Sequence, residues 1–305
     1  MSRKPLVSVV VLTHGEGPYV ADTVRSVLAT DYVPLEIIVV DNEASEKTKC
    51  LIQTLPTNIR VVETGKNLGF AGGNNKGIEV ATGEIVVLLN DDTRVEPEWI
   101  SAFVEQFQMR PNAGICGGLL LSWDGASIQH AGGIVLPNGL TWHVGQGEPF
   151  HRQYPGIRET EYVTGAVFAI HRKVLDRIGL LESSYFPLYF EEVEYCRLAR
   201  KVGFEVLYVP KAIVYHRVME TSGQFSQKYF CRYHVNRLRF LLRNYTVGEM
   251  IRAAVHELKW ILSGKNRDQY APLLKAYLKT LLSLLSILQG RRRLKRIRGC
   301  RTAQN

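Results

Sequence analysis

The stretch Glu84-Ile-Val-Val-Leu-Leu-Asn-Asp-Asp92 decides the fold, because an apolar run ends abruptly in an amide and two carboxylates. The run from Ile85 to Leu89 is short and follows Gly83, which is typical of a buried strand in a parallel sheet. Such sheets bind ligands at the carboxyl edge of their strands. The oxygens that close the run suit Mg²⁺ or Mn²⁺, ions that usually share their coordination with substrate phosphates. The same residues also fit a plain acidic turn that caps the next helix, since Pro97 suits a first helical turn.

Apolar strand-like runs alternate with amphipathic helical patterns through the first third of the chain. The expected strands are 6–12, 35–40, 59–63 and 85–89, and the expected helices are 19–28, 46–55, 74–81 and 97–109. This alternation indicates an α/β domain with a Rossmann-like, mostly parallel central sheet flanked by helices. Farther along, the sequence predicts strands at 113–121, 128–136 and 205–215, helices at 171–178 and 189–202, and a long loop over 137–160.

Composition limits the compartment and the partners. Five cysteines without a Cys-x-x-Cys pair argue against a zinc ribbon and a disulfide framework, and therefore favour a reducing compartment. The N-terminus lacks the apolar region and cleavage site of a signal peptide, so we expect the protein to stay in the cytosol. Residues 217–305 hold 19 Lys and Arg against 4 Asp and Glu, whereas residues 1–216 hold 19 against 25. The basic character therefore belongs to the tail, where nucleic acid and anionic lipid both fit by charge.

Small residues follow the first strand, in Thr13-His-Gly-Glu-Gly-Pro18, and Asp41 closes the second strand. A Gly-x-Gly turn with a later Asp suggests a dinucleotide fingerprint, but Val20 occupies the third glycine position and Pro18 removes a backbone donor. What remains is a turn that includes Gly15 beside an acid able to accept hydrogen bonds from a base or ribose. A plain glycine turn with an Asx turn explains these residues equally well.

The segment Asn67-Leu-Gly-Phe-Ala-Gly-Gly-Asn-Asn-Lys-Gly77 lies between the third strand and its helix. Its glycines predict a tight loop with exposed backbone, and Asn67, Asn74 and Asn75 add amide donors and acceptors at the same sheet edge. It lacks the Gly-Lys-Ser/Thr ending of a Walker loop. The alternative is a flexible turn with an Asn cap.

An acidic cluster begins the helix expected at 189–202. Glu191 and Glu194 share a helix face and Glu192 points elsewhere, which fits either complementation of the helix dipole or a catalytic carboxylate. The flanking aromatic residues would raise the pKa of a carboxylate and prepare it as a base; they are Tyr185, Phe186, Tyr189 and Phe190. His216 closes the strand 205–215, in which Pro210 indicates an edge or a bulge. Its imidazole is either a structural hydrogen-bonding group or the completion of a metal site begun by Asp92.

These segments, in this order, resemble those of family 2 glycosyltransferases with the GT-A fold, in particular bacterial rhamnosyltransferase-like members. The segments are Val-Ser-Val-Val-Val-Leu-Thr at 7–13, Ile-Ile-Val-Val-Asp-Asn at 37–42, Asn-Leu-Gly-Phe-Ala-Gly-Gly-Asn-Asn at 67–75, Leu-Leu-Asn-Asp-Asp-Thr at 88–93, Val-Thr-Gly-Ala at 163–166, Tyr-Phe-Glu-Glu-Val-Glu-Tyr-Cys at 189–196 and Val-Pro-Lys-Ala-Ile-Val-Tyr-His at 209–216. The resemblance covers about residues 6–245. It implies inverting transfer of a sugar, with rhamnose or another hexose as the best guess, from a dTDP- or UDP-linked donor to a glycan or lipid-linked acceptor in cell-surface polysaccharide synthesis.

The resemblance also assigns roles to residues. It implies that the nucleotide sugar is surrounded by Thr13, Gly15, Asp41, Asn67, Asn74 and Asp91. It implies that Asp92 binds Mg²⁺ or Mn²⁺ with His216 as a second ligand. Glu192 would be the catalytic base, with Glu191 in reserve, because this chain has Glu-Glu where the family usually has Glu-Asp. The expected domains are a catalytic domain, 1–245, with a nucleotide-sugar half (1–112) and an acceptor half (113–245), and a basic helical tail, 246–305.

The tail predicts an amphipathic helix. Lysines and serines recur at helical spacing over 275–286 and leucines cover the other side, while the charge-free stretch 280–290 is too short to span a bilayer of ~30 Å. A polybasic run, 291–298, follows. We expect residues 271–298 to dock on an anionic cytoplasmic leaflet, which would make the protein peripheral on the inner face of the cell membrane. The alternative is that the leucines pack on the catalytic domain or on a second subunit of a homo-oligomer.

Two other functions compete with the glycosyltransferase. A nucleotide-dependent oxidoreductase with a Rossmann-type fold is disfavoured by the defective glycine fingerprint and has no need of the acidic triplet. A nucleic-acid-binding module would use the basic tail but would leave the acidic residues unexplained, so we expect no nucleic-acid partner.

Overall fold

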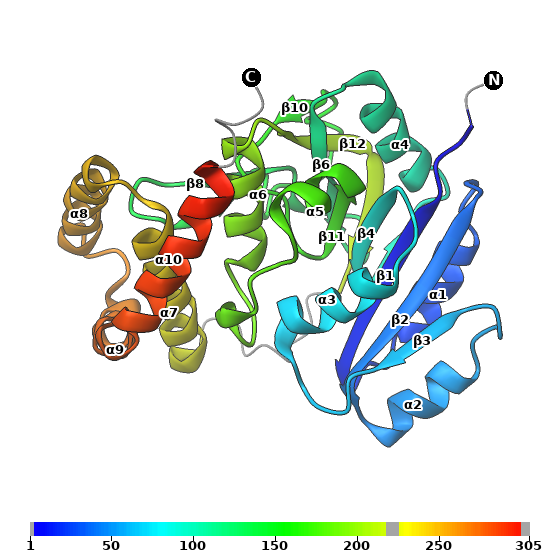
Figure 1. Cartoon of the computed structure of the whole chain (residues 1–305), viewed down its shortest axis with the longest axis horizontal. Helices are drawn as coiled ribbons and strands as arrows, with labels where there is room; N and C mark the ends of the chain where they lie inside the picture. The colour runs from blue at the N-terminus through cyan, green and yellow to red at the C-terminus, as the bar shows by residue number, and fades with distance from the viewer. Residues whose placement is uncertain (1–2, 218–225, 300–305) are drawn as a thin grey trace. The chain divides into compact units, whose positions relative to one another are not determined.

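The computed structural model describes residues 3–217 and 226–299, which form two compact units (Figure 1). Of the described residues, the larger unit contains 3–133 and 143–217, and the smaller contains 134–142 and 226–299. This division differs from the boundary expected at residue 245. Helix α7 (Gln227–Asn244) belongs to the smaller unit because it packs extensively on α9 (Tyr270–Leu282).

The larger unit is built on a mixed sheet with the strand order β10-β12-β6-β11-β4-β1-β2-β3, with β5 beside β12 and β7 beside β6. The strands are β1 (Val7–Gly15), β2 (Leu35–Ala44), β3 (Arg60–Glu63), β4 (Ile85–Asn90), β5 (Thr93–Val95), β6 (Ala113–Ser122), β7 (Ile128–His130), β10 (Arg158–Glu159), β11 (Val167–His171) and β12 (Glu205–His216). Strands β3, β2, β1 and β4 are parallel, as the sequence predicts. Strand β11 runs antiparallel between β4 and β6, whereas β6 and β12 are parallel.

Helices cover both faces of this sheet (Figure 1). They are α1 (Val20–Leu28), α2 (Glu46–Gln53), α3 (Gly69–Val80), α4 (Trp99–Met109), α5 (Arg172–Ile178) and α6 (Glu191–Lys201), with a 3₁₀ turn at Ser183–Tyr185. Alternate strand residues such as Val9 and Val11 share one apolar core with α1, α2 and α4. The intervening residue Val10 faces α3, and Phe168 of β11 packs on Tyr195 of α6. The sheet is therefore buried on both sides, which explains the near-continuous apolar runs of its strands.

The prediction of a loop over 67–77 is wrong in its extent, because α3 already begins at Gly69. The glycines lie inside the helix and bring it close to the sheet. A Cβ added to Gly77 would lie 2.2 Å from Val10 Cγ1, and one added to Gly73 would lie 2.5 Å from Leu12 Cδ1. Backbone approach to the sheet, rather than a flexible loop, therefore explains why glycine occupies these positions.

Two further expectations concern the second half of the sheet. The strand expected over 128–136 is interrupted, because Gly132 adopts φ +99° and separates β7 from β8 (Gly133–Val135). The long loop expected over 137–160 contains two short strands, β10 and β9 (Thr141–His143). The expected bulge at Pro210 is confirmed by a register shift of β12 on β6 between Val209 and Ile213.

The smaller unit contains α7, α8 (Val247–Leu262), α9 and α10 (Leu284–Gly299), a 3₁₀ turn at Arg267–Gln269, and the hairpin of β8 and β9. Thr246 and Glu249, which have the sequence spacing of a capping box, form one at the start of α8. Arg237 of α7 is fully buried and forms a bidentate ion pair with Glu257 of α8, at 2.6 and 2.8 Å. Tyr277 of α9 donates to the same carboxylate at 3.0 Å, so one ionic cluster joins three helices.

Among the described residues, no single helix has the length and apolar character needed to cross a bilayer. The segments 267–282 and 284–292 pass that test only as a pair, bent by 67° where they meet.

Candidate active site

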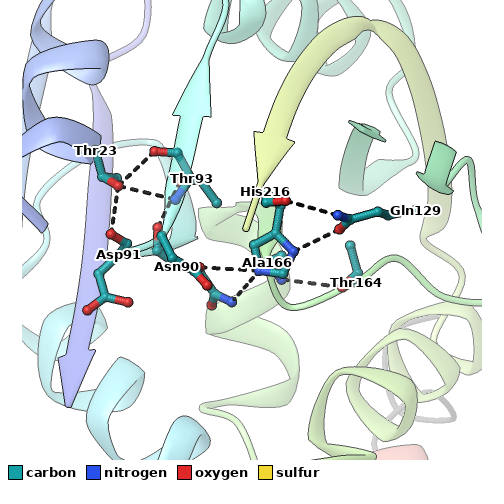
Figure 2. Close-up of polar contacts among 9 residues, drawn as sticks. Thr23, Asn90, Asp91, Thr93, Gln129, Thr164, Ala166 and His216 are labelled. Atoms are coloured by element: carbon teal, nitrogen blue, oxygen red, sulfur yellow. Dashed lines mark hydrogen bonds and ion pairs between the residues drawn. The ribbon is translucent and has the colours of Figure 1, made fainter. Parts of the chain in front are cut away.

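The acidic turn that follows β4 is held in place by α1. The Thr23 hydroxyl lies 2.8 Å from Asp91 O and 2.7 Å from Thr93 O, and it accepts a hydrogen bond from Thr93 N at 3.2 Å. The Thr93 hydroxyl in turn donates to Asn90 O at 2.8 Å (Figure 2). These contacts fix the backbone of the turn that carries Asp91 and Asp92.

His216 meets Asp92 at this turn, as the sequence suggests. Strand β12 pairs antiparallel with β5, which places His216 opposite Thr93. His216 Nε2 lies 3.2 Å from Asp92 Oδ1 and 3.4 Å from Asn90 Nδ2. A carboxylate oxygen and an imidazole nitrogen that are distant in sequence therefore face each other at the carboxyl edge of the sheet.

Gln129 of β7 fixes the orientation of the His216 ring, which lies between Asn90 and Gln129 (Figure 2). Gln129 Nε2 lies 2.9 Å from His216 O, and a carbonyl oxygen can only accept, so the amide nitrogen must face it. Gln129 Oε1 therefore faces His216 Nδ1, at 2.9 Å, and accepts a hydrogen bond from the Nδ1–H group. The Nε2 lone pair is left directed toward the acidic turn, as expected of a histidine that binds a metal.

The donor atoms of this turn suit a divalent cation. Asp92 Oδ1 is buried, and the described residues offer it no hydrogen-bond donor. No group of three or more His, Cys, Asp or Glu side chains able to hold a metal ion occurs in the described part of the chain. Asp92 and His216 would therefore supply only part of a coordination shell. This incomplete set fits Mg²⁺ or Mn²⁺, whose remaining positions are commonly filled by water and substrate phosphate.

Asp91 lies against the end of β1, where Thr13 and Gly17 flank it. A Cβ added to Gly17 would lie 2.4 Å from Asp91 Oδ2 and 2.2 Å from Thr13 Oγ1, so only glycine leaves room for this approach. Burial raises the pKa of Asp91 to about 7, and the neighbouring Thr13 hydroxyl, which stabilises the ionised form, opposes this only in part. The structure thus brings two of the expected donor-site residues together.

Arg217 places a fixed positive charge beside the same turn. Its backbone N donates to Asp92 O at 3.0 Å. Its guanidinium lies 4.4 Å from the centre of the Tyr19 ring and 3.9 Å from that of Trp123, which orients the side chain by cation–π contact. The positive charge of the Arg217 guanidinium complements a diphosphate at this position. No sequence motif identifies Arg217 as a residue of the site.

The remaining donor-site candidates lie on the adjoining strand ends. Asp41 pairs with Thr13 in the sheet register, and its Oδ1 accepts from Ala44 N at 2.7 Å. Asn67 Oδ1 accepts from Gly69 N at 2.7 Å, while its Nδ2 lies 3.0 Å from His14 Nε2. Asn67 therefore already ties the first and third strand ends together.

Gly15 and Asn74 complete the expected set. Gly15 adopts φ +60°, and its carbonyl accepts from Thr48 Oγ1 at 3.0 Å, so it forms the turn after β1. Asn74 Nδ2 donates to Phe70 O within α3 at 3.0 Å. Its Oδ1 is buried and meets no donor among the described residues.

Glu191 and Glu192 occupy the first turn of α6. Tyr189 and Phe190, which precede them, both adopt positive φ, 84° and 79°, and this uncommon backbone sets where the helix begins. Burial raises the pKa of Glu192 to about 7. Burial, together with the Glu192 charge, raises the pKa of Glu191 well above its ordinary value. The rise expected from the aromatic surroundings is thus present in both acids, while Glu194 is bound by the Tyr185 hydroxyl at 2.9 Å.

The segment 163–166 connects α6 to the acidic turn. Asn90 N donates to Ala166 O at 3.1 Å, and the Cys196 thiol of α6 contacts the backbone of Val163. A Cβ on Gly165 would lie 2.7 Å from Phe70 of α3. Helix α3, helix α6 and the acidic turn after β4 therefore all contact this one short segment.

Comparison with known proteins agrees with this arrangement. The model described as Glycosyl transferase family 2 matches residues 8–179. An uncharacterized protein of Sinorhizobium fredii is 32% identical over 240 residues, which cover 73% of this chain but only 26% of that protein. The N-acetylglucosaminyl-diphospho-decaprenol L-rhamnosyltransferase of Mycobacterium tuberculosis is 25% identical over 256 residues, which cover 76% of this chain and 83% of the enzyme.

The structure of GalNAc-T7 with UDP, GalNAc and Mn²⁺ superposes with a TM-score of 0.63 at 18% identity, over 80% of this chain and 48% of that one. This similarity establishes the GT-A architecture of the sheet and its helices, and the family match removes the oxidoreductase alternative. The chain belongs to glycosyl transferase family 2 and is a glycosyltransferase with a GT-A fold.

Proposed function

We propose that this glycosyltransferase moves a sugar from a nucleoside diphosphate donor to a hydroxyl of a glycan or lipid-linked acceptor, with inversion, in cell-surface polysaccharide synthesis. The observation that carries the proposal is the pairing of Asp92 Oδ1 with His216 Nε2 at 3.2 Å, beside the strand end that holds Asp91. The name of the mycobacterial relative supports rhamnose and a lipid-diphosphate acceptor, and rhamnose would arrive on dTDP. UDP remains the other donor nucleotide.

The donor would lie along the carboxyl edge of β1, β2 and β4. Its diphosphate would approach Asp91, Asp92 and the Arg217 guanidinium. Mg²⁺ or Mn²⁺ held by Asp92 and His216 would act as a Lewis acid that offsets the charge on the departing diphosphate. Asp41 and Asn74 would receive hydrogen bonds from the nucleoside and the sugar.

The acceptor hydroxyl would be activated by Glu192. Its carboxylate takes the hydroxyl proton while the acceptor oxygen forms a bond to the anomeric carbon, and the bond from that carbon to the diphosphate oxygen breaks. The electron pair of the broken bond leaves with the nucleoside diphosphate. Attack from the face opposite the leaving group inverts the anomeric configuration. Glu191, whose pKa burial and the Glu192 charge raise well above its ordinary value, would stay protonated beside the base.

The test is a panel of nucleotide sugars, each assayed for donor hydrolysis and for transfer to a lipid-linked acceptor, with and without Mn²⁺. We expect turnover with dTDP-rhamnose or a UDP-hexose that requires the cation and yields an inverted product. Turnover with no nucleotide sugar in the panel would reject the proposed donor class, and cation-independent turnover would reject the role of Asp92 and His216.

The protein would work on the cytoplasmic face of the cell membrane, docked through residues 271–298. In α9 the leucines at 274, 278, 281 and 282 are exposed, while Leu273, Ala276 and Thr280 are buried. Arg291 is engaged in the protein, because it donates to Leu242 O and Tyr245 O at the end of α7. Of the expected polybasic run, 291–298, the side chains at 293 and 295–298 lie outside the described part of the chain.

Removing residues 271–305 is a poor test of this docking, because α9 packs on α7 and its loss would damage the smaller unit. The variant Leu274→Gln/Leu278→Gln changes only exposed side chains. We expect it to weaken sedimentation with vesicles that contain phosphatidylglycerol. Unaltered sedimentation, with the wild type bound, would contradict docking through this helix.

A further inference from the structure

Helix α8 carries an exposed row of aliphatic side chains that the proposed function does not use. The row consists of Val247, Ile251, Val255, Leu258 and Leu262, which are 49 to 76% exposed. Their spacing of three and four residues places them on one face of the helix. Single exposed apolar residues are ordinary on a protein surface, but a continuous row of five along four turns indicates a surface that binds something.

The opposite face of α8 is fixed to the protein, so the row cannot turn inward while these contacts persist. Ala253 and Glu257 are buried, and Glu257 is held by Arg237 at 2.6 and 2.8 Å. Trp260 stacks edge-on against Tyr270, with ring centres 6.1 Å apart. The capping box at Thr246 fixes the first turn. The row is therefore presented outward by a helix with a defined rotation.

The polar surroundings of the row are basic. On α8 itself the exposed charged side chains are Arg252 and Lys259, and the one other acid besides Glu257, the half-buried Glu249, is held in the capping box. Glu257 adds no exposed negative charge because Arg237 neutralises it within the unit. Aliphatic residues bordered by lysine and arginine are typical of a helix that lies in the plane of an anionic bilayer.

A protein partner fits this surface less well. Protein interfaces are enriched in tyrosine, tryptophan and arginine at their centre and depleted in lysine. The row on α8 contains only valine, isoleucine and leucine, without an exposed aromatic anchor or a polar group to set a register.

We propose that α8 is a lipid-docking helix whose aliphatic row enters the headgroup boundary of an anionic bilayer, while Arg252 and Lys259 contact lipid phosphates. This surface lies outside residues 271–298, and its proposal depends on neither the sugar donor nor the catalytic mechanism.

The experiment is flotation of the full-length protein with vesicles of phosphatidylcholine alone or with phosphatidylglycerol. The variant Ile251→Gln/Leu258→Gln removes two members of the row without touching the buried face. We expect its partition onto phosphatidylglycerol vesicles to fall at least about tenfold, because each apolar side chain that enters the interface adds to binding. Arg252→Gln/Lys259→Gln should lower only the binding that depends on phosphatidylglycerol and that high salt removes.

The matched control is Val33→Gln/Met109→Gln, which changes two residues of the larger unit that are 69 and 70% exposed. It should leave flotation unchanged, and circular dichroism and thermal melting should show that every variant is folded. A wild type that stays with the unbound fraction, or an α8 variant that floats as the wild type does, would overturn the proposal. Light scattering that shows a wild-type dimer converted to a monomer by the α8 variant, with flotation unchanged, would assign the row to a second copy instead.

Discussion

Burial sets the protonation of the acids that begin α6. Because it raises the pKa of Glu192 from an ordinary 4.5 to about 7, the ionised form that serves as a base becomes dominant only above that pH. We expect the turnover number to fall about tenfold for each pH unit below about 6. Stability runs the opposite way: the contribution of the protonated acid is complete below pH 4.5 and is lost as the pH rises through about 7.

Glu192→Gln should abolish transfer and leave donor binding nearly intact, since the amide cannot accept the proton. Glu191→Gln mimics the protonated acid and should retain most of the activity. The measurements are turnover from pH 5 to 9 and nucleotide binding for both variants. If Glu191→Gln is the inactive one, the base is Glu191; if Glu192→Gln turns over normally, Glu192 has no such role.

Gln129 controls the imidazole that faces Asp92. Gln129→Leu keeps the size of the side chain but removes both hydrogen bonds to His216, so the ring can rotate or change its tautomer. We expect the Mn²⁺ concentration for half-maximal stabilisation by UDP or dTDP to rise about 10- to 100-fold. Gln108→Leu makes the same change on the exposed side of α4 and should have no effect. An unchanged Mn²⁺ requirement in Gln129→Leu would show that the hydrogen bonds to Gln129 are not needed.

The sequence predicts the residues that would bind the cation, but not the residues that hold them in position. Asp92 follows β4 and His216 ends β12, and both side chains are of types that commonly bind metal ions. Thr23, Gln129 and Arg217 lie in segments without a motif, and only the register of β12 with β5 and the approach of β7 reveal their contacts.

The glycines of α3 allow this helix to pack closely on the central sheet. Gly77→Ala would place a methyl group 2.2 Å from Val10 Cγ1 and 3.0 Å from Val40 Cγ2 in a core without space for it. We expect a loss of about 1 to 3 kcal/mol in the free energy of unfolding, despite the better helix propensity of alanine. Gly156→Ala, where an added Cβ meets nothing within 4 Å, is the control. Equal stability of both variants in urea denaturation would contradict this account of the glycines.

Local sequence patterns predict most of the helices and strands, but not all of their boundaries. Most strand and helix positions follow from apolar periodicity, and the spacing of Thr246 and Glu249 marks the start of α8. The start of α3 was missed because glycines usually indicate a loop, and only the tertiary contacts of Gly73 and Gly77 explain a glycine-rich helix. The break at Gly132 escaped prediction for a related reason, since its positive φ depends on the turn between β7 and β8.

At the scale of the whole molecule, the smaller unit has its own buried ionic cluster. Arg237→Met leaves the Glu257 carboxylate without its partner in a buried site, so we expect it to destabilise that unit by about 3 to 5 kcal/mol. Hydrogen exchange should show loss of protection in α7, α8 and α9. Arg232→Met, a half-buried arginine on the same helix, is the control. Protection of α7 to α9 that survives Arg237→Met would show that the cluster is not what holds these helices together.

The sequence predicts a basic tail apart from an acidic catalytic part, but it does not show that α7 and residues 134–142 belong with that tail. One contact that joins these two segments is the hydrogen bond that Arg237 of α7 donates to Asn138 O at 2.7 Å.

Metal-dependent nucleotide binding tests the central claim most directly. Thermal melting of the wild type, Asp92→Asn, His216→Ala and the exposed control Asp22→Asn is measured with UDP and with dTDP, in the presence and absence of Mn²⁺. We predict that Mn²⁺ and a nucleotide together raise the melting temperature of the wild type and the control, and that this joint effect is lost in Asp92→Asn and His216→Ala. Equal stabilisation of all four proteins by Mn²⁺ and nucleotide would contradict the assignment of Asp92 and His216 as the cation site.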